Sequence, residues 1–258
     1  MPTVLIINDI SAKLGLNIYE SFYEIFIHNN TQTHELIEEI NECLISQNIE
    51  MLRKLVDKAN DDVNFLNGEP FQFLRYSQSC ISSFSDKDYP EAIRFALSGL
   101  QASDTISIKK KEWYSNIELM LLFCLAVNYM RCKDFESCEI VYNLLIEYIS
   151  KVLDNKSYSI HIKYHFELNF SGRLLYSYYL YDRKTCAEKY ADLFDKVIST
   201  LTKCGCMDNL PELIVCSACL TNDQDKKNEL MLKSRQLGYF IYGEEKMEQK
   251  IARISEEA

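Results

Sequence analysis

Four cysteines late in the chain have a spacing that could serve metal chemistry. Cys204 and Cys206 flank a glycine, and Cys216 and Cys219 follow with two residues between them, so four thiols lie within 16 positions. Structural zinc sites use four such ligands in two pairs that turns bring together. The second pair, however, falls in an apolar stretch with the pattern of a helix. We therefore predict no cofactor, and zinc binding by these thiols stays an open alternative.

Other motifs give no support for catalysis. His161 and His165 are spaced four apart on a predicted helix, but Ile162 stands where a zinc protease has a glutamate. Glycine-rich phosphate loops and the G-x-S-x-G motif are absent from the sequence. Paired acids such as Glu38 and Glu39 show no sign of the burial that acid–base catalysis requires. We predict that the protein is not an enzyme.

Polar side chains within apolar helical stretches point instead to peptide binding. Asn128, Asn169 and Arg173 interrupt such stretches, and a tyrosine-rich segment that includes Tyr178 surrounds the last two. An amide can both donate to and accept from a peptide backbone, a guanidinium can hold a carboxylate, and tyrosine offers a rigid apolar surface with a polar tip. We predict these four residues as the peptide-binding set.

Composition limits the possible partners. The 258 residues carry 28 Lys and Arg against 38 Asp and Glu, a net charge of −10 that opposes binding to nucleic acid. The basic run Lys109–Lys111 has acids on both sides and is typical of a solvated loop. The apolar stretch 117–130 is too short to span a bilayer. Ten cysteines, mostly at apolar positions, indicate a reducing cytoplasm.

Helices account for the whole pattern. Apolar residues are 47% of the chain, and seven glycines and four prolines are too few for an all-β fold. The apolar spacing therefore predicts an all-α protein. We expect helices over residues 3–14, 18–27, 32–46, 49–61, 70–84, 89–103, 112–131, 135–153, 157–180, 184–202, 210–220, 224–237 and 242–256.

A degenerate repeat runs through these helices. Polar turns at Asp88–Pro90, Asp134–Glu136 and Arg183–Lys184 each precede a small residue that opens a second helix, and these small residues are Ala92, Cys138 and Cys186. The pattern resembles tetratricopeptide hairpins, although the spacings of 46 and 48 residues exceed the usual ~34. We expect a superhelical stack of helical hairpins whose concave face could hold an extended peptide.

The N-terminal segment carries a second resemblance. Residues 2–22, with Pro2, Thr3, Leu5 and a later Leu14-Gly15-Leu16, resemble the last two helices of a Cro/lambda-repressor helix-turn-helix domain. Such a domain fused to helical repeats is similar to the Rgg/PlcR/PrgX peptide-pheromone regulators. The DNA-reading helices of that family would lie upstream of Met1.

This resemblance implies a function. We expect a helix-turn-helix remnant at 1–28 and a repeat domain at 29–258, in a cytoplasmic, dimeric transcriptional regulator that senses a short signalling peptide in quorum sensing. DNA binding would require the missing segment to be supplied, and no membrane partner is expected. The alternative is a helical-repeat adaptor that binds a protein and neither pheromone nor DNA.

Replacing Asn128 by alanine tests the peptide-binding set. If the amide pairs with the peptide backbone in a groove shielded from water, Asn128→Ala should weaken binding by about 1–3 kcal/mol. Titration calorimetry with the peptide measures this change, and unchanged affinity would remove Asn128 from the set.

Overall fold

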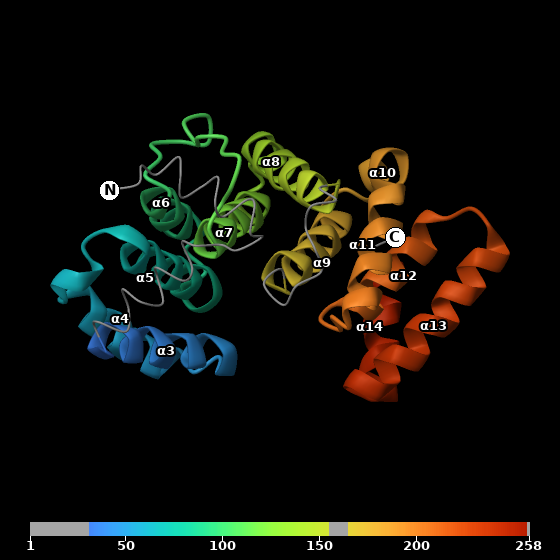
Figure 1. The fold of residues 1–258 in the computed structure, drawn as a ribbon, viewed down its shortest axis with the longest axis horizontal. Coiled ribbons are helices and arrows are strands. Elements are labelled where there is room, and N and C mark those ends of the chain that lie inside the picture. The colour runs from blue at the N-terminus through green and yellow to red at the C-terminus, as the bar shows by residue number, and fades with distance from the viewer. Residues whose placement is uncertain (1–30, 155–164, 257–258) are drawn as a thin grey trace, which may run out of the picture. The chain divides into compact units, whose positions relative to one another are not determined.

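The computed structural model describes residues 31–154 and 165–256, and every regular element in them is helical (Figure 1). This confirms the predicted all-α class. The helices predicted at 3–14 and 18–27, and with them the 1–28 domain, lie outside the described residues. Within the described part, no helix has the length and apolar character needed to cross a membrane. The chain divides after Leu145 into two compact units.

In the first unit the helices follow the predicted order with three differences. The helix predicted at 89–103 ends at Gly99. The predicted helix at 70–84 is an α-helix that continues as a wider π-helix, and the helix predicted from residue 112 begins only at Asn116, where Ser115 caps it. The described elements are α3 (Thr31–Ser46), α4 (Ile49–Asn60), the 3-10 turn η1 (Val63–Phe65), α5 (Gly68–Cys80), the π-helix η2 (Ile81–Asp86), α6 (Tyr89–Gly99), α7 (Asn116–Cys132) and the start of α8 (Phe135–Asp154).

The second unit repeats one packing arrangement. Its described elements are α9 (His165–Tyr181), α10 (Arg183–Thr185), the π-helix η4 (Cys186–Tyr190), α11 (Ala191–Cys204), α12 (Leu210–Leu220), α13 (Gln224–Tyr242) and α14 (Glu244–Glu256). The helices α9, α11 and α12 contact one another in all three pairings, and so do α12, α13 and α14. The first unit has the same triangle in α5, α6 and α7. Sequential hairpins pack in this way when each helix lies against the next two.

An aspartate caps the second helix at each of the three predicted turns. A helix begins with backbone N–H groups that have no partner within it, and an aspartate side chain can accept from one of them. The carboxylates of Asp88, Asp134 and Asp182 accept from the N–H groups of Glu91 (3.1 Å), Ser137 (3.2 Å) and Thr185 (2.9 Å). The polar turn in the sequence is therefore a helix cap.

The small residue that follows each cap lies against the preceding helix. Ala92, Cys138 and Cys186 are each 0% exposed. The Ser79 hydroxyl on α5 donates to the Ala92 carbonyl at 2.8 Å, and the Cys138 thiol donates to the Ala126 carbonyl on α7 at 3.3 Å. Bonds between a side chain and the facing backbone require a close approach, which only small side chains permit.

One apolar cluster holds the start of the first unit together. It joins α3, α4, η1 and the first part of α5, so the 3-10 turn is part of the core. Its buried members are Leu36, Ile40, Cys43, Leu52, Leu55, Val56, Ala59, Phe65, Leu74 and, at the start of η2, Ile81.

Helix α12 is the centre of the second unit and is buried on every side from Leu210 to Ala218. The burial includes the Glu212 carboxylate, which accepts from the Lys250 ammonium on α14 at 2.7 Å and from the Tyr242 hydroxyl at 3.3 Å. Burial, with the nearby carboxylate, raises the pKa of Tyr242. A buried carboxylate needs such partners because its desolvation is costly. Glu212 thus ties α14 and the end of α13 to α12.

Removing the ammonium should show how much this tie contributes. Lys250→Met keeps most of the side-chain length but leaves the Glu212 charge without its cation, so we expect the free energy of unfolding to fall by about 3 kcal/mol. Chemical denaturation followed by circular dichroism measures this change in the free energy of unfolding. The control is Lys54→Met in the exposed pair of Lys54 and Glu50 (2.9 Å), which should cost less than about 1 kcal/mol. Similar small losses in both variants would contradict a structural role for Glu212.

Candidate functional site

Helix α9 leaves one face partly open. Residues on a helix that recur every three to four positions share a face, and on α9 one such set is half-buried or exposed. Outside this set, Leu168 and Tyr181 near the two ends are half-buried and the other described side chains are buried. We call this set the α9 face: Phe166, Asn169, Arg173, Tyr176, Ser177 and Leu180. A helix that is apolar on nearly all sides is expected to be buried on all of them. The partial exposure of this set therefore distinguishes the α9 face from the rest of the helix.

Packing against α11 and α12 fixes how α9 is rotated. Gly172 lies on the buried side, where an added Cβ would come within 3.2 Å of the Leu213 side chain and 3.3 Å of Leu201. The glycine therefore permits a close approach to both neighbouring helices. Leu174 and Leu175, both fully buried, continue the contact surface. The α9 face is what this packing leaves uncovered.

Two predicted peptide-binding residues, Asn169 and Arg173, share the α9 face one helical turn apart. The side-chain oxygen of Asn169 is buried and has no hydrogen-bond partner. The Arg173 guanidinium is exposed, and no carboxylate among the described residues pairs with it. An unsatisfied buried oxygen costs about 1–3 kcal/mol. The exposed guanidinium is available to a carboxylate, whereas the Asn169 oxygen would reach a ligand N–H only after its side chain rotates.

Aromatic rings border these two polar groups. Phe166 is half-buried and stacks on Phe170, with ring centroids 5.9 Å apart and planes inclined by 14°. Tyr176 is half-buried at the other end of the face. Aromatic rings offer broad, rigid surfaces to apolar side chains. The α9 face therefore combines amide, guanidinium and aromatic surface.

Tyr178, the third prediction on this helix, lies on its opposite side. Tyr178 follows Asn169 by nine residues, which is two and a half turns of an α-helix, so the two side chains point in opposite directions. Tyr178 is 1% exposed. Its ring packs against Tyr181 and Tyr190 at 5.8 and 5.7 Å between centroids. Tyr178 is a core residue in this structure, and we do not place it on the α9 face.

Asn128 lies in the first unit and is 1% exposed. Its side-chain nitrogen donates to the Cys124 carbonyl at 2.8 Å, and its oxygen accepts from the Ser83 hydroxyl at 2.7 Å. Both polar ends of the amide thus have protein partners. Asn128 joins α7 to η2 in this structure and presents no open group to a peptide.

The four late cysteines do not form a cluster. Cys204 and Cys206 flank Gly205 at the end of α11, whereas Cys216 and Cys219 lie within α12. Burial raises the pKa values of the Cys206 and Cys216 thiols, which opposes the thiolate form that zinc requires. Within the described ranges, no three His, Cys, Asp or Glu side chains come together as metal ligands would.

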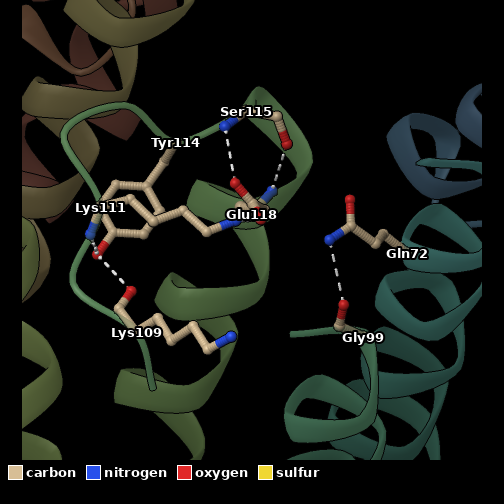
Figure 2. A network of polar contacts seen from close by, with 7 residues as sticks. All are labelled: Gln72, Gly99, Lys109, Lys111, Tyr114, Ser115 and Glu118. Carbon is tan, nitrogen blue, oxygen red and sulfur yellow. Dashed lines mark hydrogen bonds and ion pairs between the residues drawn. The ribbon is translucent and has the colours of Figure 1, made fainter. Parts of the chain in front are cut away.

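The basic run at 109–111 belongs to a folded loop (Figure 2). The Tyr114 hydroxyl donates to the Lys109 carbonyl at 3.3 Å and accepts from the Lys111 N–H at 3.1 Å. The Lys111 ammonium pairs with Glu118, whose carboxylate also accepts from the Ser115 N–H at 3.0 Å in a capping box. Lys109, Lys110 and Lys111 are all exposed, which agrees with the expectation of a solvated loop, and the Lys111 charge is paired within the same unit.

The contacts of Asn128 generate a prediction about stability. Asn128→Ala removes the buried acceptor of the Ser83 hydroxyl and the side-chain bond to the Cys124 carbonyl, so the free energy of unfolding should fall by about 1–3 kcal/mol. Ser83→Ala alone should cost less, because the amide keeps its bond to Cys124. Thermal and urea denaturation provide the measurements, and a fully stable Asn128→Ala protein would contradict the structural role.

Comparisons with protein-family models, with curated proteins and with solved structures find no match to this chain. Among the described surfaces, the α9 face combines a buried amide oxygen that has no hydrogen-bond partner with an exposed guanidinium.

Proposed function

We propose that the second unit binds an extended peptide along the α9 face. The observation that carries the proposal is a pair of polar groups on one side of α9: the buried oxygen of Asn169 and the exposed guanidinium of Arg173, neither of which has a partner among the described residues. Both residues come from a helix that is otherwise packed into the core. A polar pair that is costly to leave unsatisfied supports a role in binding.

The chemistry of the two groups suggests how the peptide is held. Rotation of the Asn169 side chain toward the open side brings its oxygen to a peptide N–H and its nitrogen to a peptide carbonyl. One turn further on, the Arg173 guanidinium pairs with a peptide carboxylate in a bidentate manner. Phe166 and Tyr176 then flank the backbone and contact apolar side chains of the peptide.

The biological role that we propose is that of a cytoplasmic receptor for a short signalling peptide, acting in transcriptional control. The support is the resemblance of residues 2–22 to a repressor-type helix-turn-helix end and the hairpin turns that follow. A chain with net charge −10 is repelled by DNA, so DNA contact would come through a partner in a dimer.

A second candidate is a protein-binding adaptor. Phe240 and Leu232 on α13 are 90% and 58% exposed, although large apolar side chains are usually covered. Two such residues on one helix favour contact with another protein surface. This candidate requires neither a peptide on the α9 face nor DNA.

Native mass spectrometry tests the peptide proposal on protein expressed in a Gram-positive host. We expect a co-purified mass of several hundred to about a thousand daltons, because a peptide bound with sub-micromolar affinity survives purification. The variants Asn169→Ala and Arg173→Gln should each reduce the occupied fraction, with affinity lower by about tenfold.

The matched control is Arg94→Gln, which removes an arginine already paired with Glu91 in the first unit. It should leave the occupied fraction unchanged. Protein that carries no ligand in several hosts would favour the adaptor, and equal occupancy in all variants would place the ligand elsewhere.

A further inference from the structure

Arg131, near the end of α7, has an unusual environment in the first unit. Its guanidinium carbon lies 5.1 Å from the centre of the Phe84 ring and 5.4 Å from that of Tyr89. One guanidinium nitrogen, Nη1, donates to the Ser83 hydroxyl at 2.6 Å. Arg131 is half-buried, whereas Phe84 is 61% exposed. Two rings and a hydroxyl therefore hold a cation at the surface.

No carboxylate of the described residues pairs with this cation. The nearby turn aspartates, Asp88 and Asp134, use their side chains to cap α6 and α8. Arg94 makes a useful contrast, because it lies over the Phe95 ring at 4.7 Å and also pairs with Glu91. The chain has ten more acids than bases, yet Arg131, like the partly buried Arg75 and Arg183, has no acid of its own among the described residues.

A buried hydrogen-bond chain fixes the orientation of Arg131. The Ser83 hydroxyl accepts from Arg131 and donates to the Asn128 oxygen, and Asn128 is anchored in turn to the Cys124 carbonyl. Ser83 and Phe84 both lie on the π-helix η2, a rare element that is often found at functional sites. Only Nη1 takes part in the chain, and the other N–H groups of the guanidinium have no hydrogen-bond partner among the described residues.

We propose that Arg131, Phe84, Tyr89 and Ser83 form a binding site for the carboxylate of a C-terminal peptide residue with an apolar side chain. A fixed guanidinium can bind a carboxylate through two parallel hydrogen bonds. The exposed ring of Phe84 supplies the surface on which the apolar side chain rests. This site lies in the first unit and uses no residue of the α9 face, so it goes beyond the function proposed above.

Nuclear magnetic resonance of the full chain, with labelled arginine, tests the site. The Nε–H signal of Arg131, assigned through its loss in Arg131→Lys, should shift saturably as N-acetyl-phenylalanine is added. N-acetyl-phenylalanine amide, which differs only in lacking the carboxylate, should leave the signal in place. N-acetyl-glutamic acid α-amide carries its carboxylate on the side chain and has no apolar side chain to rest on Phe84. It should therefore bind about tenfold more weakly than N-acetyl-phenylalanine.

The variants separate this site from general charge effects. With the backbone N–H of Ser83 as reporter, Arg131→Gln should raise the dissociation constant for N-acetyl-phenylalanine at least about tenfold. Arg94→Gln should leave it unchanged. If Arg131→Gln alters the whole spectrum, Phe84→Ala carries the test, because its exposed ring can be removed without opening the core.

Two results would overturn the proposal: equal shifts with the acid and its amide, or the absence of a saturable shift at Arg131. The variant Arg173→Gln should not affect this titration. Failure here therefore leaves the peptide proposal for α9 untouched, and loss of the co-purified peptide leaves this site untouched.

Discussion

The aspartate caps at the hairpin turns fix the arrangement of the helices that follow them. The first N–H groups of any helix need an acceptor from outside it, and Asp88, Asp134 and Asp182 each supply one. Because the cap sets the residue at which the second helix begins, it also sets which residue faces the first helix one turn later. That residue is small in all three turns, so the helices approach closely. Both open polar sites lie on helices positioned by these hairpins.

The sequence alone predicts much of the fold because caps and small residues are local signals. The helices and the three turns follow from the spacing of apolar residues and from the polar residues between them. The start of α7 was predicted four residues early, because the capping box of Ser115 and Glu118 is a better start than the charged stretch before it. The superhelical arrangement stays a prediction, since it concerns relations beyond the individual hairpins.

The sites were less predictable because they depend on how each helix is rotated against its neighbours. Asn169 and Arg173 could be paired from their spacing of four residues. Asn128 has the same sequence signature, an amide in an apolar helix, yet the Ser83 hydroxyl from another helix satisfies it. Tyr178 belongs to a helix with aromatic residues on most sides, so only the contacts of α9 with α11 and α12 reveal which side is covered. The environment of Arg131 cannot be predicted for the same reason, since Phe84 and Tyr89 lie far from it in sequence.

The π-helix η2 makes the environment of Arg131 sensitive to chain length. A π-helical turn contains about one residue more than an α-helical turn, and each residue of an α-helix advances the direction of its side chain by about 100°. Deleting one residue between Ile81 and Asp86 would allow ordinary α-helical pairing, but it would also turn Ser83 and Phe84 away from the guanidinium. A variant of this chain that lacks one residue in this segment would therefore keep the fold but lose the Arg131 site. A variant of unchanged length in this segment would keep both.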